Sequence, residues 1–351
     1  MVDYLVVGLG LAGTAFCELL EQHNKSFVCI SDQSQQASVV AGGLYNPVIL
    51  KRFTPAWRAQ EQLEIALPFY TQLEEKLQTK LDYKLPVLRR FASVEEQNNW
   101  FQAADRPQLQ PFLSLQIREN HNPLLDAPFG FGEVLHTGRV ATKTLLKKYA
   151  EYLREKGCLQ EETFDFEAME VSPDKVRYQR ITARKVVFAS GFGLKENPYF
   201  QYLPLNGTKG ELLTIKAPEL KEKQVIKSSV FIIPLGDDLY RVGATYKWKD
   251  KTNIPTEASR NELLQKLEVF LKADYEVVKH VAGIRPTVTD RRPLVGRHPA
   301  HTHVFVLNGL GSRGVLIAPY AAQQLLHYIE KDMPLQEEMD IKRFTKMYRP
   351  H

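Results

Sequence analysis

Short apolar runs alternate with amphipathic stretches along this 351-residue chain, and the two patterns predict different elements. Residues 4–7, 27–30 and 181–188 are rich in Val, Ile, Leu and Phe, which is typical of strands buried in a parallel sheet. Helical spacing of apolar residues extends over residues 14–21, 55–77 (with Pro68 as a kink), 141–156, 256–271 and 315–329. Strands followed by helices predict an α/β domain.

A different pattern occupies residues 211–245. Three strand-like runs, 211–216, 225–234 and 239–245, with a Gly-Asp-Asp turn before the last, predict antiparallel hairpins. A further strand is expected to begin at Glu276. Residues 84–134 are rich in Pro, Asn and Phe, and we expect an irregular insertion outside the nucleotide fold there.

The loop from Gly8 to Gly13 has the pattern Gly-x-Gly-x-x-Gly and joins the first predicted strand to the first helix. In such a loop one glycine makes the tight turn, one lets backbone N–H groups approach a pyrophosphate, and one lets the helix pack on the strand. Asp32 follows the second strand at the distance at which an acid accepts hydrogen bonds from ribose. These features together predict a dinucleotide site, whereas the glycines alone would also fit an ordinary α/β turn.

The same glycine pattern returns at residues 309–314, behind the apolar run 303–308. No strand that ends in an acid follows it, so we expect this helix N-terminus to face the other end of the same cofactor. The predicted cofactor-binding residues are Gly8, Gly10, Leu11, Ala12, Gly13, Asp32, Gly42, Gly43, Leu44, Ala189, Ser190, Gly191, Gly309, Gly311, Ser312, Arg313 and Gly314.

The composition and charge of the chain argue against several classes of protein. The chain is 44% hydrophobic and 25% charged, and its formal charge of +5 comes from scattered lysines and arginines, which favours solvated helix faces over a nucleic-acid stripe. The three cysteines are widely spaced and form no Cys-x-x-Cys pair, which predicts a cytoplasmic protein. The chain contains no run of 18 apolar residues, so we expect no membrane span. His298, His301 and His303 lack nearby acids, so no metal site is expected.

Three segments resemble known flavoenzymes. Ala282-Gly283-Ile284-Arg285-Pro286, with the Asp, Pro and Gly that follow up to Pro299, is similar to the Ala-Gly-Leu-Arg-Pro segment of glycine oxidases in the D-amino-acid oxidase superfamily. Gly311-Ser312-Arg313-Gly314 with Ala318-Pro319, and residues 43–47, resemble the oxidase half of the bacterial enzyme that completes methylaminomethyl-uridine at the tRNA wobble position.

The resemblance implies an α/β protein (α+β overall) in which a Rossmann-like domain holds FAD non-covalently and a discontinuous substrate domain is built on an antiparallel sheet. We expect the FAD-binding domain to comprise residues 1–83, 135–205 and 280–351. The substrate domain would then comprise residues 84–134 and 206–279.

The resemblance also implies an amine oxidase: hydride transfer from the carbon beside the amine of glycine, sarcosine or a D-amino acid to flavin N5, imine hydrolysis, and reoxidation by O₂ to give H₂O₂. A neutral amine needs no side-chain base. Arg285 and Arg313 match arginines that bind substrate in glycine oxidases, although Arg285 could instead pair with Asp290 or a carbonyl, and Arg313 could only cap a loop. Phe231 replaces the family's tyrosine, and Tyr246 is the candidate substitute.

Three alternatives remain at this stage. The substrate could be a wobble uridine in tRNA whose carboxymethylaminomethyl group presents the same amine and carboxylate. The protein could be a flavoprotein that hands electrons to a partner instead of oxygen. A plain NAD(P) dehydrogenase fits the first glycine loop but not the C-terminal segments.

Overall fold

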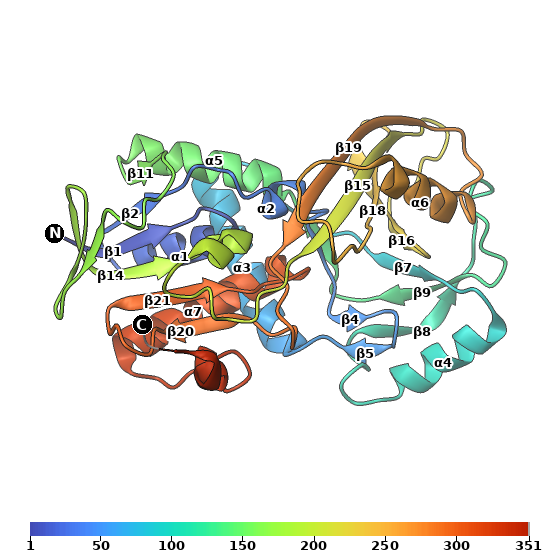
Figure 1. The fold of residues 1–351 in the computed structure, drawn as a ribbon. Coiled ribbons are helices and arrows are strands. Elements are labelled where there is room, and N and C mark those ends of the chain that lie inside the picture. The colour runs from blue at the N-terminus through green and yellow to red at the C-terminus, as the bar shows by residue number, and fades with distance from the viewer. Residues whose placement is uncertain (350–351) are drawn as a thin grey trace.

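The computed structural model describes residues 1–349, and the predicted buried strands form the centre of its parallel sheet (Figure 1). β1 (Val2–Val7) pairs in parallel with β2 (Phe27–Ile30) on one side and with β14 (Ile181–Phe188) on the other. β14 also pairs in parallel with β21 (Val304–Asn308). The predicted α/β fold class is confirmed, and the loops after these strands meet at one edge of the sheet.

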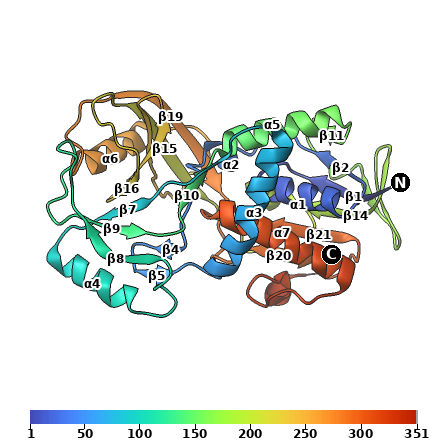
Figure 2. The same cartoon turned by 180° about the vertical axis from the view of Figure 1, so that it is seen from behind.

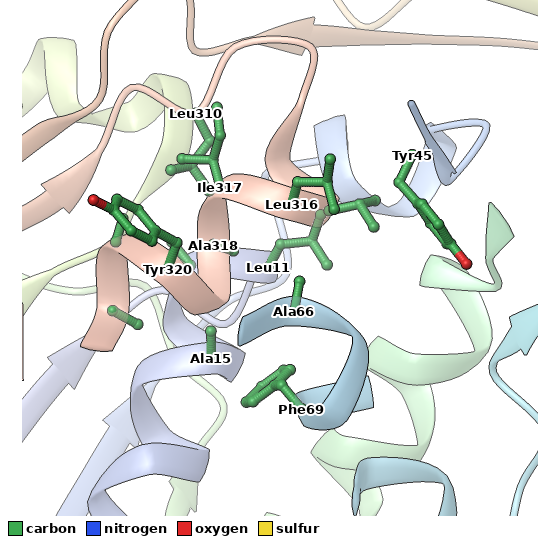
Figure 3. Packing of buried hydrophobic residues seen from close by; sticks show 14 of the residues in the cluster. Leu11, Ala15, Tyr45, Ala66, Phe69, Leu310, Leu316, Ile317, Ala318 and Tyr320 are labelled. Atoms are coloured by element: carbon green, nitrogen blue, oxygen red, sulfur yellow. The ribbon is translucent and has the colours of Figure 1, made fainter. Parts of the chain in front are cut away.

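Four long helices cover this sheet: α1 (Leu11–Gln22), α3 (Ala59–Leu77), α5 (Thr142–Glu155) and α7 (Gly314–Lys331). Figure 2 shows α1, α3 and α7 side by side, and Figure 3 shows Ala15, Ala66 and Ala318 where these three helices pack together. Their small side chains are fully buried and let the helices approach closely. Pro68 lies inside α3 without ending it.

The second large sheet has the strand order β19-β15-β18-β17-β16-β7-β9-β8. Its neighbours are antiparallel except β16 and β7, which run parallel. The strands are β7 (Val87–Arg90), β8 (Leu113–Arg118), β9 (Phe131–Val134), β15 (Thr208–Lys216), β16 (Val225–Lys227), β17 (Phe231–Gly236), β18 (Leu239–Gly243) and β19 (Glu276–Arg285). The helix α6 (Glu257–Glu268) packs on it, close to the predicted range.

The expectation that residues 84–134 are irregular is wrong. They supply three strands of this sheet and the helix α4 (Val94–Ala104). The overlooked signal was a capping box, in which the Ser93 hydroxyl accepts from the Glu96 amide at 3.2 Å and the Glu96 carboxylate accepts from the Ala92 amide at 2.7 Å. Buried Trp100 then anchors α4 edge-on against Phe91, with ring centroids 5.6 Å apart.

The predicted single strand 225–234 is also wrong, because it is two strands. The amide of Ser228 donates to the carbonyl of Val230 at 3.0 Å and turns the chain back on itself. Lys227 at the end of β16 therefore stands opposite Phe231 at the start of β17. This pairing sets up one wall of the site described below.

The shorter elements complete the fold. They are β3 (Leu44–Tyr45), β6 (Asp82–Tyr83) and β10 (Gly138–Val140) in one small sheet, β4 (Val48–Ile49) with β5 (Thr54–Pro55), the strands β11 (Leu159–Gln160), β12 (Met169–Val171), β13 (Val176–Tyr178) and β20 (Leu294–Arg297), and the helices α2 (Ala37–Val40), η1 (Gly191–Glu196) and η2 (Ile341–Met347). None of the helices within residues 1–349 has the length and apolar character needed to span a bilayer.

The expected domain division groups residues 84–134 with 206–279. Strands from both ranges pair in one sheet. β19 continues in that sheet through position 280, where the division places a boundary. The two-domain assignment stays a prediction.

Candidate active site

One cavity of about 870 Å³ extends from the edge of the parallel sheet to the antiparallel sheet. This volume lies toward the upper end of the range for ligand sites, roughly 300–1,000 Å³. Both glycine loops contribute to its lining, together with residues after β2, β3 and β14 and one face of the antiparallel sheet. Segments far apart in the sequence therefore meet around a single space.

The first glycine loop is built for close backbone approach. Gly8 has φ +101°, and a Cβ there would lie 2.6 Å from the carbonyl oxygen of Ala189. A Cβ at Gly13 would lie 1.9 Å from the carbonyl oxygen of Gly8, so Gly13 serves packing and does not line the cavity. The first N–H groups of α1 have no partner within the helix, and the loop presents this N-terminus to the cavity.

Asp32 lies at the same end of the cavity. Its carboxylate accepts hydrogen bonds from the Ser34 amide at 2.9 Å and the Thr163 hydroxyl at 3.1 Å. Burial by itself raises the pKa of Asp32, but these hydrogen bonds outweigh it and hold the pKa below its ordinary value. Asp32 is therefore a charged acceptor at neutral pH, as a ribose contact requires.

The second glycine loop begins α7 beside α1. A Cβ at Gly314 would lie 3.2 Å from Leu11, and Figure 3 shows Leu11 next to Leu316 of α7. Gly309 does not line the cavity, and a Cβ there would lie 2.7 Å from Val288 and 3.0 Å from the backbone nitrogen of Leu294. The other predicted cofactor residues that line the cavity are Gly10, Leu11, Ala12, Gly42, Gly43, Leu44, Ala189, Ser190, Gly191, Gly311, Ser312, Arg313 and Gly314.

Arg285 ends β19 inside the cavity. A Cβ at Gly210 would lie 2.0 Å from its Nη2, so the guanidinium rests on bare backbone. Nη1 donates to the carbonyl of Thr245 at 3.2 Å, and no carboxylate of the described residues lies within ion-pair distance. Asp290, the alternative partner considered from sequence, binds Arg343 at 2.8 Å instead. Burial lowers the pKa of Arg285 from its ordinary value, as expected of a cation without a counterion.

Arg313 lines the cavity from the C-terminal glycine loop but is already engaged. Its Nη1 donates to the carbonyl of Asn46 at 2.6 Å and its Nη2 to the carbonyl of Val48 at 3.3 Å. Burial lowers the pKa of Arg313 to about 10, which leaves it charged at neutral pH. Arg313 thus ties the second glycine loop to the segment that follows β3.

Tyr246 occupies a different place from the one expected for a substitute phenol. β18 ends at Gly243, and the exposed Tyr246 side chain does not line the cavity. Its ring lies beneath the guanidinium of Arg285, 5.3 Å from ring centroid to Cζ, and packs edge-on against Trp248. Any part that Tyr246 has in substrate orientation would act through Arg285.

Sequence reasoning missed Lys227, which also lines the cavity. Its ammonium lies 4.6 Å from the ring centroid of Phe231, and its one hydrogen bond within residues 1–349 goes to the carbonyl of Ser229 at 3.4 Å. Burial, with the positive charges of Arg89 and Lys266, lowers the pKa of Lys227 to about 8. The sequence pattern predicted one continuous strand over residues 225–234. The structure has a hairpin there, which brings Lys227 opposite the apolar Phe231.

The cavity can also be compared with the positions of metal-binding side chains and cysteines in residues 1–349. Those residues hold no group of three or more His, Cys, Asp or Glu side chains arranged to bind a metal ion. Cys17 and Cys29 are buried in the core, and neither these nor Cys158 is among the residues that line the cavity.

The cavity fits the FAD that the sequence resemblance implies. It offers a helix N-terminus on glycine backbone for a pyrophosphate and a charged Asp32 for a ribose. Its far wall combines the apolar Leu212 and Phe231 with two cations, Arg285 and Lys227. The residues that would contact FAD include predicted residues from both glycine loops, one near each end of the chain.

Comparison with known proteins agrees with this geometry. The chain is 24% identical to the glycine oxidase of Pseudomonas aeruginosa over 350 residues, covering 94% of this chain and 95% of that one. It is 27% identical over 180 residues to the tRNA 5-methylaminomethyl-2-thiouridine biosynthesis bifunctional protein MnmC of Aromatoleum aromaticum, a match that covers 45% of this chain and only 28% of that relative. The crystal structure of glycine oxidase from Geobacillus kaustophilus superposes with a TM-score of 0.79 at 20% identity, covering 98% and 97% of the two chains.

A family model decides the assignment. The model of the FAD dependent oxidoreductase family, DAO, matches residues 3–327, which is most of the chain. FAD is the cofactor of this family, and the residues that line the cavity fit it. The chain belongs to the FAD-dependent oxidoreductase family and is an FAD-dependent enzyme.

Proposed function

We propose that this enzyme oxidises the C–N bond of a primary or secondary α-amino acid of the glycine, sarcosine or D-amino-acid type. The observation that carries the proposal is Arg285: a guanidinium in the cavity, on the bare backbone of Gly210, without a carboxylate partner among the described residues. A guanidinium binds a carboxylate through two parallel hydrogen bonds, so it fixes the α-carbon of an amino acid in space.

Bound FAD supplies the redox chemistry by accepting a hydride from the carbon beside the amine, and the imine product then hydrolyses to a carbonyl compound. The protein's own residues bind and orient the substrate. Arg285 holds the carboxylate, Tyr246 supports the guanidinium from below, and Leu212 and Phe231 form an apolar wall that excludes water. We propose O₂ as the electron acceptor, with H₂O₂ as product.

The similarity to glycine oxidases along nearly the whole chain supports this proposal. Phe231 limits it, because a phenyl ring cannot supply the hydrogen bond of the tyrosine that glycine oxidases have on this strand. We therefore expect free glycine to bind less tightly than it would with that hydrogen bond. The amino-acid class is unchanged, because Arg285 and the apolar wall are both present.

The test is the visible spectrum of the purified FAD-loaded enzyme during anaerobic addition of glycine, sarcosine and D-amino acids. Bleaching of the oxidised flavin band, followed by recovery and peroxide on admission of air, is the expected result. Bleaching without peroxide would make the enzyme a dehydrogenase that hands electrons to a partner. Failure of every amino acid to bleach the band would refute the proposal.

A second candidate function is oxidation of a carboxymethylaminomethyl group on a tRNA wobble uridine. It is favoured by the similarity to the bifunctional MnmC relatives over 45% of this chain. Arg285 would bind the carboxylate of that group as it would bind a free amino acid. The same spectral experiment with hypomodified tRNA separates the two, because bleaching by tRNA alone would establish the second function.

A further inference from the structure

The parallel-sheet side of the cavity carries both signs of charge, because the cations Lys143, Lys147 and Arg154 of α5 line it together with acids. The antiparallel side contributes no acid to the charged residues that line the cavity. Every acid among them belongs to the parallel-sheet side: Asp32, Glu151, Glu162 and Glu196. The antiparallel sheet, the segment after β4 and the C-terminal glycine loop contribute only cations: Lys51, Lys227, Arg285 and Arg313. One α-carboxylate needs one guanidinium, so this end of the cavity holds more positive charge than a simple amino acid would neutralise.

Strand register shows how these cations are spaced. Lys227, Phe231, Gly243 and Leu212 stand opposite one another on four consecutive strands, and all four line the cavity. Neighbouring strands lie about 4.8 Å apart, so the backbones of Lys227 and Leu212 are roughly 14 Å apart. The Arg285 guanidinium lies over Gly210, beside the Leu212 end of this row. Arg285 and Lys227 therefore belong to opposite ends of this row, an arrangement that suits two separate acidic groups.

The far end of the row lacks counterions. The two basic neighbours of Lys227 are neutralised by their own partners, Arg89 by Glu96 at 2.5 Å and Lys266 by Glu262 at 2.6 Å. Lys227 itself has no carboxylate within ion-pair distance among residues 1–349. A charge left unpaired in a partly buried wall is costly unless a ligand neutralises it.

A second cation lies in this part of the sheet. Arg241 stands opposite Ile233, which lines the cavity, on the same sheet face as Gly243. Its Nε and Nη1 are buried and have no hydrogen-bond partner among the described residues. Arg241 does not line the cavity itself, and burial together with the positive charge of Arg139 lowers its pKa from the ordinary value.

From this arrangement we infer that the substrate is an amino acid with a second acidic group, a carboxylate at the far end of its side chain or nitrogen substituent, and that Lys227 is the residue that selects it. This inference rests on the proposed function, because Arg285 must hold the α-carboxylate. The methylene chain between the two acids would lie along Leu212 and Phe231, which offer apolar contact and no hydrogen bonds.

The experiment measures binding without turnover, so that its outcome is independent of whether amino acids are oxidised. Glutarate and adipate are titrated into the FAD-loaded enzyme against valerate and hexanoate, which have the same numbers of carbons and one carboxylate fewer. The perturbation of the flavin absorption band gives each dissociation constant. We expect the dicarboxylates to bind at least about tenfold more tightly, the effect of one charge-assisted hydrogen bond.

Three variants identify the residue responsible. Lys227→Met is expected to reduce the preference for dicarboxylates to less than about threefold, while Lys227→Arg, which keeps the charge, should retain it. Lys216→Met removes an exposed lysine from the same sheet outside the cavity and should also retain it. If the Lys227→Arg enzyme keeps the preference for dicarboxylates, the protein also tolerates replacement of the side chain at position 227.

Equal binding of dicarboxylates and monocarboxylates by the native enzyme would overturn the inference, as would a preference that survives in Lys227→Met. Uridine monophosphate serves as a probe for a nucleic-acid substrate. Lys227-dependent binding of this nucleotide without binding of the dicarboxylates would also overturn the inference, since the second anion would then be a phosphate. The proposed amino-acid oxidation would fail separately, in the spectral experiment with amines.

Discussion

The two ends of the cavity are built in opposite ways. At the parallel-sheet end, the groups that fit a pyrophosphate and a ribose are the glycines of one short loop, a helix N-terminus and Asp32. All of them come from the first 32 residues. At the antiparallel end, side chains do the work, and Arg285, Lys227 and Phe231 come from three different strands. The cofactor end is therefore encoded in local sequence, whereas the substrate end depends on strand register.

The largest effect is expected from a substitution in the glycine loop at the parallel-sheet end of the cavity. In Gly13→Ala the new Cβ would lie 1.9 Å from the carbonyl oxygen of Gly8, so the start of α1 must move. We expect an overpacking cost of about 3 kcal/mol or more and loss of bound FAD. Absorbance of the purified protein at the flavin band measures FAD per chain.

Gly193→Ala is the matched control for this change. Its Cβ would lie 3.3 Å from the flexible side chain of Gln35 in the same cavity. FAD content should stay near that of the native enzyme. If both variants retain FAD equally, the close contact at Gly13 does not determine cofactor binding.

The second largest effect is expected from substitution of Arg285 at the antiparallel-sheet end of the cavity. Arg285→Met removes the proposed carboxylate ligand and should lower kcat/KM for amino acids by about 10²–10³-fold, the loss expected for a desolvated charge pair. FAD content should not change. Arg285→Lys should recover only part of the activity, because an ammonium cannot make two parallel hydrogen bonds. Stopped-flow flavin reduction measures all three enzymes, and unchanged rates would exclude Arg285 as the carboxylate site.

A smaller effect is expected at Asp32. Asp32→Ala removes a charged acceptor for ribose, and we expect FAD to bind about tenfold more weakly with kcat of the saturated enzyme unchanged. Fluorescence titration of the FAD-free protein measures this affinity. Asp174→Ala, on an exposed turn away from the cavity, is the control and should bind FAD normally. Equal affinities would show that Asp32 does not contact the cofactor.

The smallest effect concerns pH at the antiparallel end. Because the pKa of Lys227 is lowered to about 8, its ammonium is charged below that pH and neutral above it. At pH 9 about one Lys227 in ten remains charged, so the preference for glutarate over valerate should fall up to about tenfold between pH 7 and pH 9. The positive charges that act on Lys227 belong to Arg89 and Lys266, and each of these is held in an ion pair with a glutamate. A preference that does not change with pH would show that Lys227 is not the group that titrates.

The sequence predicted the parallel sheet, its helices and the glycine loops because their signals lie within a few residues of each other. Gly8, Asp32 and Gly311 all line the cavity as expected. Gly13 and Gly309 show the limit of a motif, since both pack in the interior and only indirectly shape the cavity.

The substrate end was predicted less well. Tyr246 follows the predicted strand by one residue, but β18 ends at Gly243 and the ring supports Arg285 instead of facing the cavity. The alternation of polar and apolar residues did not identify Lys227 as a cavity residue. Lys227 lies opposite Phe231 only because the chain turns between two short strands, β16 and β17. Pairing between distant strands decides which side chains face a cavity, and a single sequence does not specify that pairing.

The most direct test of the account compares amino acids with the same amines lacking a carboxylate. Anaerobic flavin reduction is followed with glycine against methylamine and sarcosine against dimethylamine. We expect the amino acids to reduce the flavin far faster, by about 10²-fold or more, because the cationic end of the cavity orients them through the carboxylate. Equal reduction by the simple amines would contradict it, since the cations would then have no part in substrate selection.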